Sequence, residues 1–103
     1  MKNKKEQIEQ IIEELAPEAM IADGYDNAIV GIADVCDKSG TRTVVAYDKQ
    51  KILKILQERD GMELEEAAEF FDYNVLGSYV GEGTPIYIDY SWALTSEDQA
   101  YVC

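Results

Sequence analysis

The chain has no lysine, arginine or histidine after Arg59, and this absence constrains its fold and its partners more than any other feature. Residues 60–103 contain ten acidic side chains, whereas residues 1–59 contain eleven acidic and nine basic ones. The second half cannot form ion pairs within itself, and its carboxylates repel one another. Direct nucleic-acid binding is disfavoured, because it needs clustered lysine and arginine. The acidic surface fits either a solubilising role or a docking face for a basic partner.

Length and composition predict one acidic domain spanning residues 1–103. The chain is 47% apolar and 29% charged, which is typical of a globular protein. No apolar run approaches the ~20 residues of a membrane span, and charges occupy the N-terminal stretch where a signal peptide would be apolar. We therefore expect a cytoplasmic protein that does not bind membranes. Cys36 is predicted to be a small core residue, and a bridge to Cys103 is disfavoured by the lack of any spacing signal.

The first half predicts one helix followed by a β-hairpin. Four apolar residues fall at helical spacing within residues 4–16, and Pro17 closes the helix: they are Ile8, Ile11, Ile12 and Leu15. Two β-branched runs, 28–36 and 41–47, flank the turn DKSG. Both runs are nearly continuous in apolar residues, which favours central strands covered on both faces. Gly31 within the first run predicts a bulge or a close neighbour.

The second half predicts a helical hairpin and a last strand. Asp48 is a suitable N-cap for a helix over 49–59, and Gly61 is suited to its end. A second helix starts near Leu64, and its predicted core stripe is Leu64, Ala67, Ala68, Phe71 and Val75. Residues 84–92 alternate, with Ile86, Ile88, Tyr90 and Trp92 on one face and Tyr87, Asp89 and Ser91 on the other, one of these faces being in solvent. The order α-ββ-αα-β predicts an α+β fold with a small three-stranded, mostly antiparallel sheet packed against helices.

The helix over 64–76 carries the candidate binding surface. On a helical wheel, Glu65, Glu69 and Asp72 form an anionic face beside the core stripe. A further face carries Glu66, Phe70 and Tyr73. Asn74 borders the core stripe, where an asparagine usually bonds to a loop backbone. The turn GEGTP is glycine-rich, but a strand follows it where a phosphate site would need a helix N-terminus.

Several stretches resemble motifs of a small family of uncharacterised bacterial and phage proteins. They are DGYDNAIVG (23–31), the dipeptide YD (47–48), DGMELEEA (60–67) and YNVLGSYVGEGTP (73–85), and the similarity covers about residues 15–88. The resemblance implies a single small domain of bacterial and mobile-element genomes, with no activity to carry over. The family pattern has serine or threonine at position 63, whereas this chain has Glu63. That difference predicts that Glu66 lacks its reciprocal hydroxyl partner.

Catalytic chemistry finds little support in the residues. The absence of histidine removes Ser-His-Asp, Cys-His and histidine-ligated metal sites. The carboxylate pairs Asp23/Asp26 and Asp34/Asp37 are candidates for acid–base work by spacing alone. We therefore expect a non-enzymatic protein without cofactor or metal.

Two binding hypotheses remain. The first is an interaction module that docks a basic protein, one form of which is a phage or mobile-element inhibitor of a nucleic-acid-binding enzyme. Its predicted surface is Glu65, Glu66, Glu69, Phe70, Asp72 and Tyr73. The alternative is a small-ligand or regulatory domain with a pocket formed by Asn74, Tyr79, Glu82 and Thr84. Exposed aromatic residues on the first surface would equally fit a homodimer.

Overall fold

A computed structural model describes residues 3–38, 40–78, 81 and 83–92, with side chains through Ser91. It confirms the predicted α+β class and the element order α-ββ-αα-β. The elements are α1 (Lys4–Leu15), β1 (Ile29–Asp37), β2 (Gly40–Asp48), α2 (Lys49–Asp60), α3 (Leu64–Phe70) and β3 (Ile86–Ile88), with short 3₁₀ turns at Asp26–Ala28 and Tyr90–Trp92 and a π-helical segment at Phe71–Leu76. The prediction for Cys103 falls outside the described residues.

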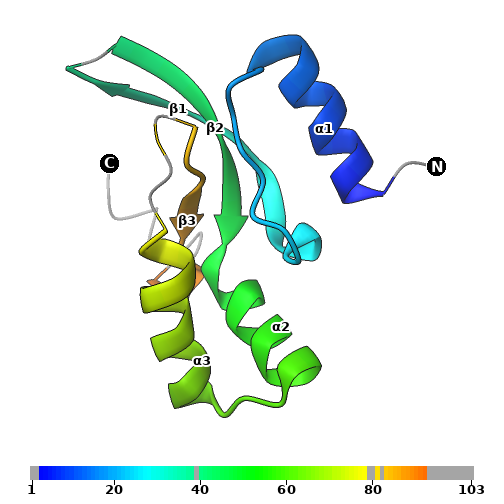
Figure 1. Cartoon of the computed structure of the whole chain (residues 1–103), viewed down its shortest axis with the longest axis vertical. Coiled ribbons are helices and arrows are strands. Elements are labelled where there is room, and N and C mark those ends of the chain that lie inside the picture. The colour runs from blue at the N-terminus through cyan, green and yellow to red at the C-terminus, as the bar shows by residue number, and fades with distance from the viewer. Residues whose placement is uncertain (1–2, 39, 79–80, 82, 93–103) are drawn as a thin grey trace, which may run out of the picture.

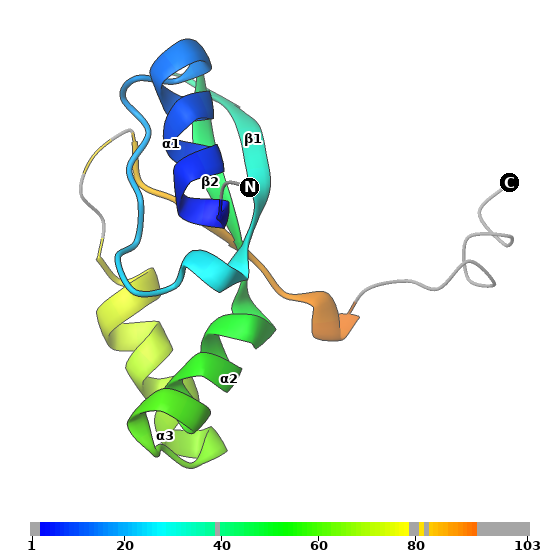
Figure 2. The same cartoon turned by 90° about the vertical axis from the view of Figure 1, so that its right-hand side faces the viewer.

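The sheet is mixed and has the order β1-β2-β3. β1 and β2 form an antiparallel hairpin, while β3 pairs with β2 in parallel. A parallel pair needs a crossover connection, and the hairpin of α2 and α3 lies in that connection. Figures 1 and 2 show α1 alongside the sheet, with α2 and α3 beyond the end of β2.

The hairpin prediction is right for β2 and only partly right for β1. Val44–Tyr47 are all buried, as expected of a central strand. The predicted irregularity at Gly31 is confirmed, because the register shifts between Ile29 and Gly31. Burial along β1 alternates and fades toward the hairpin turn, so this edge strand is not covered on both faces. Cys36, predicted to be a core residue, is therefore exposed.

The last strand is shorter than predicted, and the structure shows which of its two faces meets the core. Only Ile86–Ile88 pair with β2, and the chain then turns at Tyr90–Trp92. Tyr87 contacts the core, whereas Ile88 is exposed. The reason is the parallel register, which places Tyr87 beside the buried Tyr47, with ring centroids 5.7 Å apart. The Phe71 ring meets Tyr87 edge-on at 5.2 Å and covers it.

Helix α1 forms where the apolar spacing predicts it, but packs over only part of its stripe. The Asn3 side chain accepts a hydrogen bond from the backbone N–H of Glu6 (2.8 Å) and so caps the helix. Ile8 is buried, while Leu15 at the far end is 65% exposed. Lys4 Nζ donates to the carbonyl oxygens of Asn27 and Ile29, which fastens the start of α1 to the start of β1.

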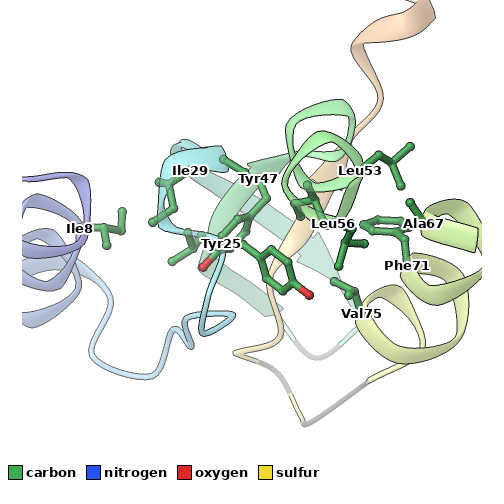
Figure 3. Packing of buried hydrophobic residues seen from close by; sticks show 12 residues of the cluster. Ile8, Tyr25, Ile29, Tyr47, Leu53, Leu56, Ala67, Phe71 and Val75 are labelled. Atoms are coloured by element: carbon green, nitrogen blue, oxygen red, sulfur yellow. The ribbon is translucent and has the colours of Figure 1, made fainter. Parts of the chain in front are cut away.

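The hairpin of α2 and α3 closes the core. The side chain of Asp48 accepts from the Lys51 N–H (3.3 Å), and Gly61 ends α2 in the left-handed region at φ 69°. Figure 3 shows side chains of α2 pointing toward those of α3 and the π-helical segment; the buried ones include Leu53, Leu56, Ala67, Phe71 and Val75. The predicted stripe fails at Leu64, which is 57% exposed because it is the first residue of α3, at the outer end of the hairpin.

Candidate functional site

The acidic residues predicted for the binding surface are exposed on α3 and the segment after it. Glu65, Glu66, Glu69 and Asp72 all reach solvent. The ion pairs among described residues join other groups, so none of these four carboxylates has a cationic partner there. Within the described part of the chain, no basic side chain neutralises their charge.

The start of α3 carries a capping box in which a glutamate replaces the hydroxyl residue. Glu66 Oε1 accepts from the backbone N–H of Glu63 at 3.5 Å, and the Glu63 side chain caps in return. The carboxylate of Glu63 thus takes the role of the hydroxyl, so Glu66 lacks a hydroxyl partner, as predicted, but has a carboxylate partner in its place. Acidic side chains at this end of the helix also interact favourably with its dipole.

Helix α3 does not continue as an α-helix after Phe70. Residues Phe71–Leu76 are π-helical, and the Gly77 N–H donates to the Asp72 carbonyl oxygen at 3.1 Å. A π-helical turn is wider than an α-helical one, so the side chains after Phe70 point in directions that differ from those on an α-helical wheel. Tyr73 is 80% exposed, as predicted, but Phe70 is half-buried against the core, so its predicted exposure is wrong.

A shallow hollow of about 280 Å³ lies on this surface. It is lined by Met62, Glu66, Glu69, Phe70, Tyr73 and Asn74. Four of the six predicted partner-binding residues are therefore brought together, while Glu65 and Asp72 lie outside the hollow. The arrangement is two aromatic rings with two carboxylates beside them.

A larger and more apolar hollow of about 440 Å³ adjoins the first and shares Phe70 and Asn74 with it. Its lining combines residues 20–23 and 25 with the end of α3 and the start of β3: Met20, Ile21, Ala22, Asp23, Tyr25, Phe70, Asn74, Val75, Ser78, Pro85 and Tyr87. Of the predicted pocket residues, Asn74 lines it and Thr84 does not. Tyr79 and Glu82 lie outside the described residues.

The side chain of Asn74, which lines this hollow, does not form the hydrogen bond that the sequence predicts. The Asn74 side chain was expected to bond a loop backbone. The side chain has no hydrogen bond to any other described residue, whereas the backbone carbonyl oxygen of Asn74 accepts from the Ser78 hydroxyl at 2.7 Å. The amide therefore remains available at the rim between the two hollows.

The wall formed by residues 20–25 is held in place by three separate contacts. Tyr47 Oη accepts from the Ala22 N–H at 2.7 Å, and burial raises the pKa of this phenol to about 12. The Met20 N–H donates to the Gly83 carbonyl oxygen at 2.9 Å. Arg59 Nη1 donates to the Gly24 carbonyl oxygen at 2.7 Å. The hollow is thus built from fixed backbone.

Two of these contacts give a role to Gly83 and Arg59, for which the apolar periodicity predicted none. A Cβ on Gly83 would lie 2.0 Å from the Glu18 carbonyl oxygen, so the close approach of the two segments requires glycine there. The Arg59 guanidinium lies 5.4 Å from the centroid of the Tyr25 ring, which it covers. The motif DGYD contained Tyr25, but no spacing signal connected it to α3.

The carboxylate pairs considered for catalysis do not act as pairs. Asp23 lines the apolar hollow, whereas Asp26 lines a separate polar depression near Asn3 and Arg59. Asp34 accepts from the Thr43 hydroxyl at 2.8 Å, and Asp37 pairs with Arg42 across the hairpin.

Searches for other sites and for related proteins give the following results. In the part of the chain that the structure describes, no group of three or more histidine, cysteine or acidic residues could hold a metal ion, and no helix has the length and apolarity to cross a membrane. No family model, curated protein or solved structure matches the chain.

Proposed function

We propose that the protein is a non-enzymatic interaction module that docks a basic segment of another protein on the exposed face of α3. One observation carries the proposal: Glu66 and Glu69 lie beside Phe70 and the exposed ring of Tyr73 in one shallow hollow. Carboxylates attract a lysine or arginine head, and an aromatic face adds a cation–π contribution. The geometry therefore fits a cationic side chain better than an anionic or neutral one.

The electrostatics of the surrounding surface support the same partner. Glu65 and Asp72 add negative charge beside the hollow, and no described ion pair neutralises it. A single-sign surface speeds the approach of an oppositely charged partner and repels one of like charge. Its contribution falls with salt, because charges are screened over roughly 8 Å at physiological ionic strength.

The most specific form of this proposal is an inhibitor that occupies the nucleic-acid channel of a basic enzyme in the cytoplasm. Six acidic residues fall between Asp60 and Asp72, which gives this edge a charge density approaching that of a nucleic-acid backbone. The sequence resemblance to phage proteins supports an origin in which such inhibition is useful.

The test compares a variant neutralised on α3 and the segment after it, called the α3 variant, with one neutralised on α1 and the segment after it, called the α1 control. The first carries Glu65→Gln, Glu66→Gln, Glu69→Gln and Asp72→Asn. The control carries the same change in charge at four exposed positions, Glu9→Gln, Glu13→Gln, Glu14→Gln and Glu18→Gln. The probe is a short lysine-rich peptide, titrated by NMR at ionic strengths from about 0.05 to 0.5 M.

We expect the native chain and the α1 control to bind the peptide with amide shifts on α3, and binding to weaken steeply with salt. The α3 variant should lose most of the affinity. Equal binding by both variants, or shifts spread over the whole surface, would show that the acidic residues are only solubilising.

A further inference from the structure

The apolar hollow has the form of an anchor site next to the cation-binding surface. We propose that it receives one large apolar or aromatic side chain of the same basic segment that docks on α3. The inference rests on the proposed function and adds to it a requirement on the partner: an apolar residue within a few positions of its lysines or arginines.

The lining supports an apolar group with a polar backbone attached. The rings of Tyr25, Phe70 and Tyr87 come from three different parts of the chain and meet around the hollow together with Val75. Buried aromatic anchors in well-packed pockets supply most of the affinity of protein interfaces. The unengaged amide of Asn74 is placed at the rim, where the backbone of a bound segment would need a hydrogen-bond partner.

The position of the hollow supports a segment that continues onto α3. Phe70 and Asn74 belong to both hollows, so a group in one is next to a group in the other. Among described residues, no lysine or arginine lines either hollow, while Asp23 lines the apolar one and Glu66 and Glu69 line the shallow one. An occupant of the apolar hollow therefore meets negative charge on leaving it, and a cationic neighbour is favoured there.

The walls are fixed before any partner arrives. The contacts from Tyr47, Gly83 and Arg59 hold residues 20–25 in place, and Tyr87 is held between Tyr47 and Phe71. A pre-formed site avoids the entropy cost of ordering its loops on binding. We therefore expect that burying the apolar residue of the partner segment in the hollow raises the affinity of that segment for the protein.

The experiment uses two peptides that differ only in the anchor. Both consist of glycine, serine and lysine; one has a central tryptophan and the other has alanine there. Titration into the ¹⁵N-labelled chain, followed by NMR, should show about tenfold tighter binding of the tryptophan peptide. The additional shifts should fall on residues 20–25, Asn74, Ser78 and Tyr87.

Substitutions at the hollow test the same point from the protein side. Met20→Trp fills the hollow and should abolish the advantage of tryptophan over alanine, with Ser78→Trp as a second filling variant should the first fail to fold. Leu76→Trp is the matched control, because Leu76 is 54% exposed and lines neither hollow.

The outcomes separate the two proposals. Equal affinity of the two peptides, with shifts confined to α3, would overturn the anchor and leave the proposed function intact. No binding of either peptide would overturn the proposed function itself. Free indole binding the hollow as tightly as the tryptophan peptide would identify a small-molecule site and would also overturn the anchor proposal.

Discussion

Helices α2 and α3 are the two arms of one hairpin, yet they differ in ion pairing: charged side chains on α2 are mostly paired, and those on α3 have no described partner. On α2, Lys49 lies 3.8 Å from Asp89, Lys54 lies 3.8 Å from Glu58, and Arg59 binds Asp60. The Glu65, Glu66 and Glu69 side chains on α3 have no such partner among the described residues. Three of the four basic side chains of α2 are paired in this way, whereas no ion pair among the described residues reaches α3, which leaves its carboxylates available to a partner from outside.

The largest expected effect concerns the core that both helices share. Phe71 is 1% exposed and packs edge-on against Tyr87. Phe71→Ala should lower the free energy of unfolding by about 3–5 kcal/mol. Phe70→Ala should cost clearly less, because Phe70 is only half-buried. Chemical denaturation ranks the two, and the reverse order would show that the π-helical segment is assigned to the wrong faces.

Alkaline pH should lower the stability of the fold through Tyr47, which lies on β2 directly before α2. Burial raises its pKa to about 12, above the usual value of 10.0. The folded state therefore holds the phenol proton more tightly than the unfolded chain does. Stability from this group is complete below pH 10 and is lost as the pH rises toward 12, by up to about 3 kcal/mol.

The control for this pH effect is Tyr47→Phe. The substitution also removes the acceptor of the Ala22 N–H, so it should lower stability at neutral pH. It should, however, flatten the decline in stability between pH 10 and 12, measured by denaturation at each pH. An unchanged decline in this variant would assign the effect to other groups, such as Tyr87, whose pKa is also raised by burial.

The smallest expected effect compares the charges of the two helices directly. Glu69→Gln with Asp72→Asn removes like-charge neighbours near the end of α3, where negative charge also opposes the helix dipole. Stability at low salt should rise by about 0.3–0.5 kcal/mol. Lys54→Gln on α2 should lower it slightly, because it breaks the pair with Glu58. Melting temperatures that move in the same direction for both variants would contradict the comparison.

Periodicity predicted which elements form, because both helices of the hairpin, α1 and the β-hairpin follow clear apolar spacings. Periodicity did not show which face of a strand is buried where both faces carry apolar or aromatic side chains. Strand β3 has isoleucine on one face and Tyr87 on the other, so alternation alone could not say which face meets the core. The parallel register decides it, and that register depends on contacts far apart in the sequence.

The candidate site was predictable as a surface but not as two hollows. Glu66, Glu69 and Tyr73 follow from a helical wheel. The π-helical segment does not, because nothing in the spacing of Phe71 and Val75 distinguishes it from an α-helix. The wall at residues 20–25 precedes the sheet in the chain, and the contacts with Tyr47, Arg59 and Gly83 that hold it against β2, α2 and the segment before β3 are all distant in sequence.

The parallel pairing of β3 also has a consequence for the order of folding. β1 and β2 are neighbours in the chain and can pair early, whereas β3 reaches β2 only after the whole crossover has formed. A three-residue edge strand that joins late is also among the first parts to open in the folded state. Because Tyr87 on β3 is a wall of the apolar hollow, its ring contacts with Tyr47 and Phe71 hold both the end of the sheet and the hollow in place.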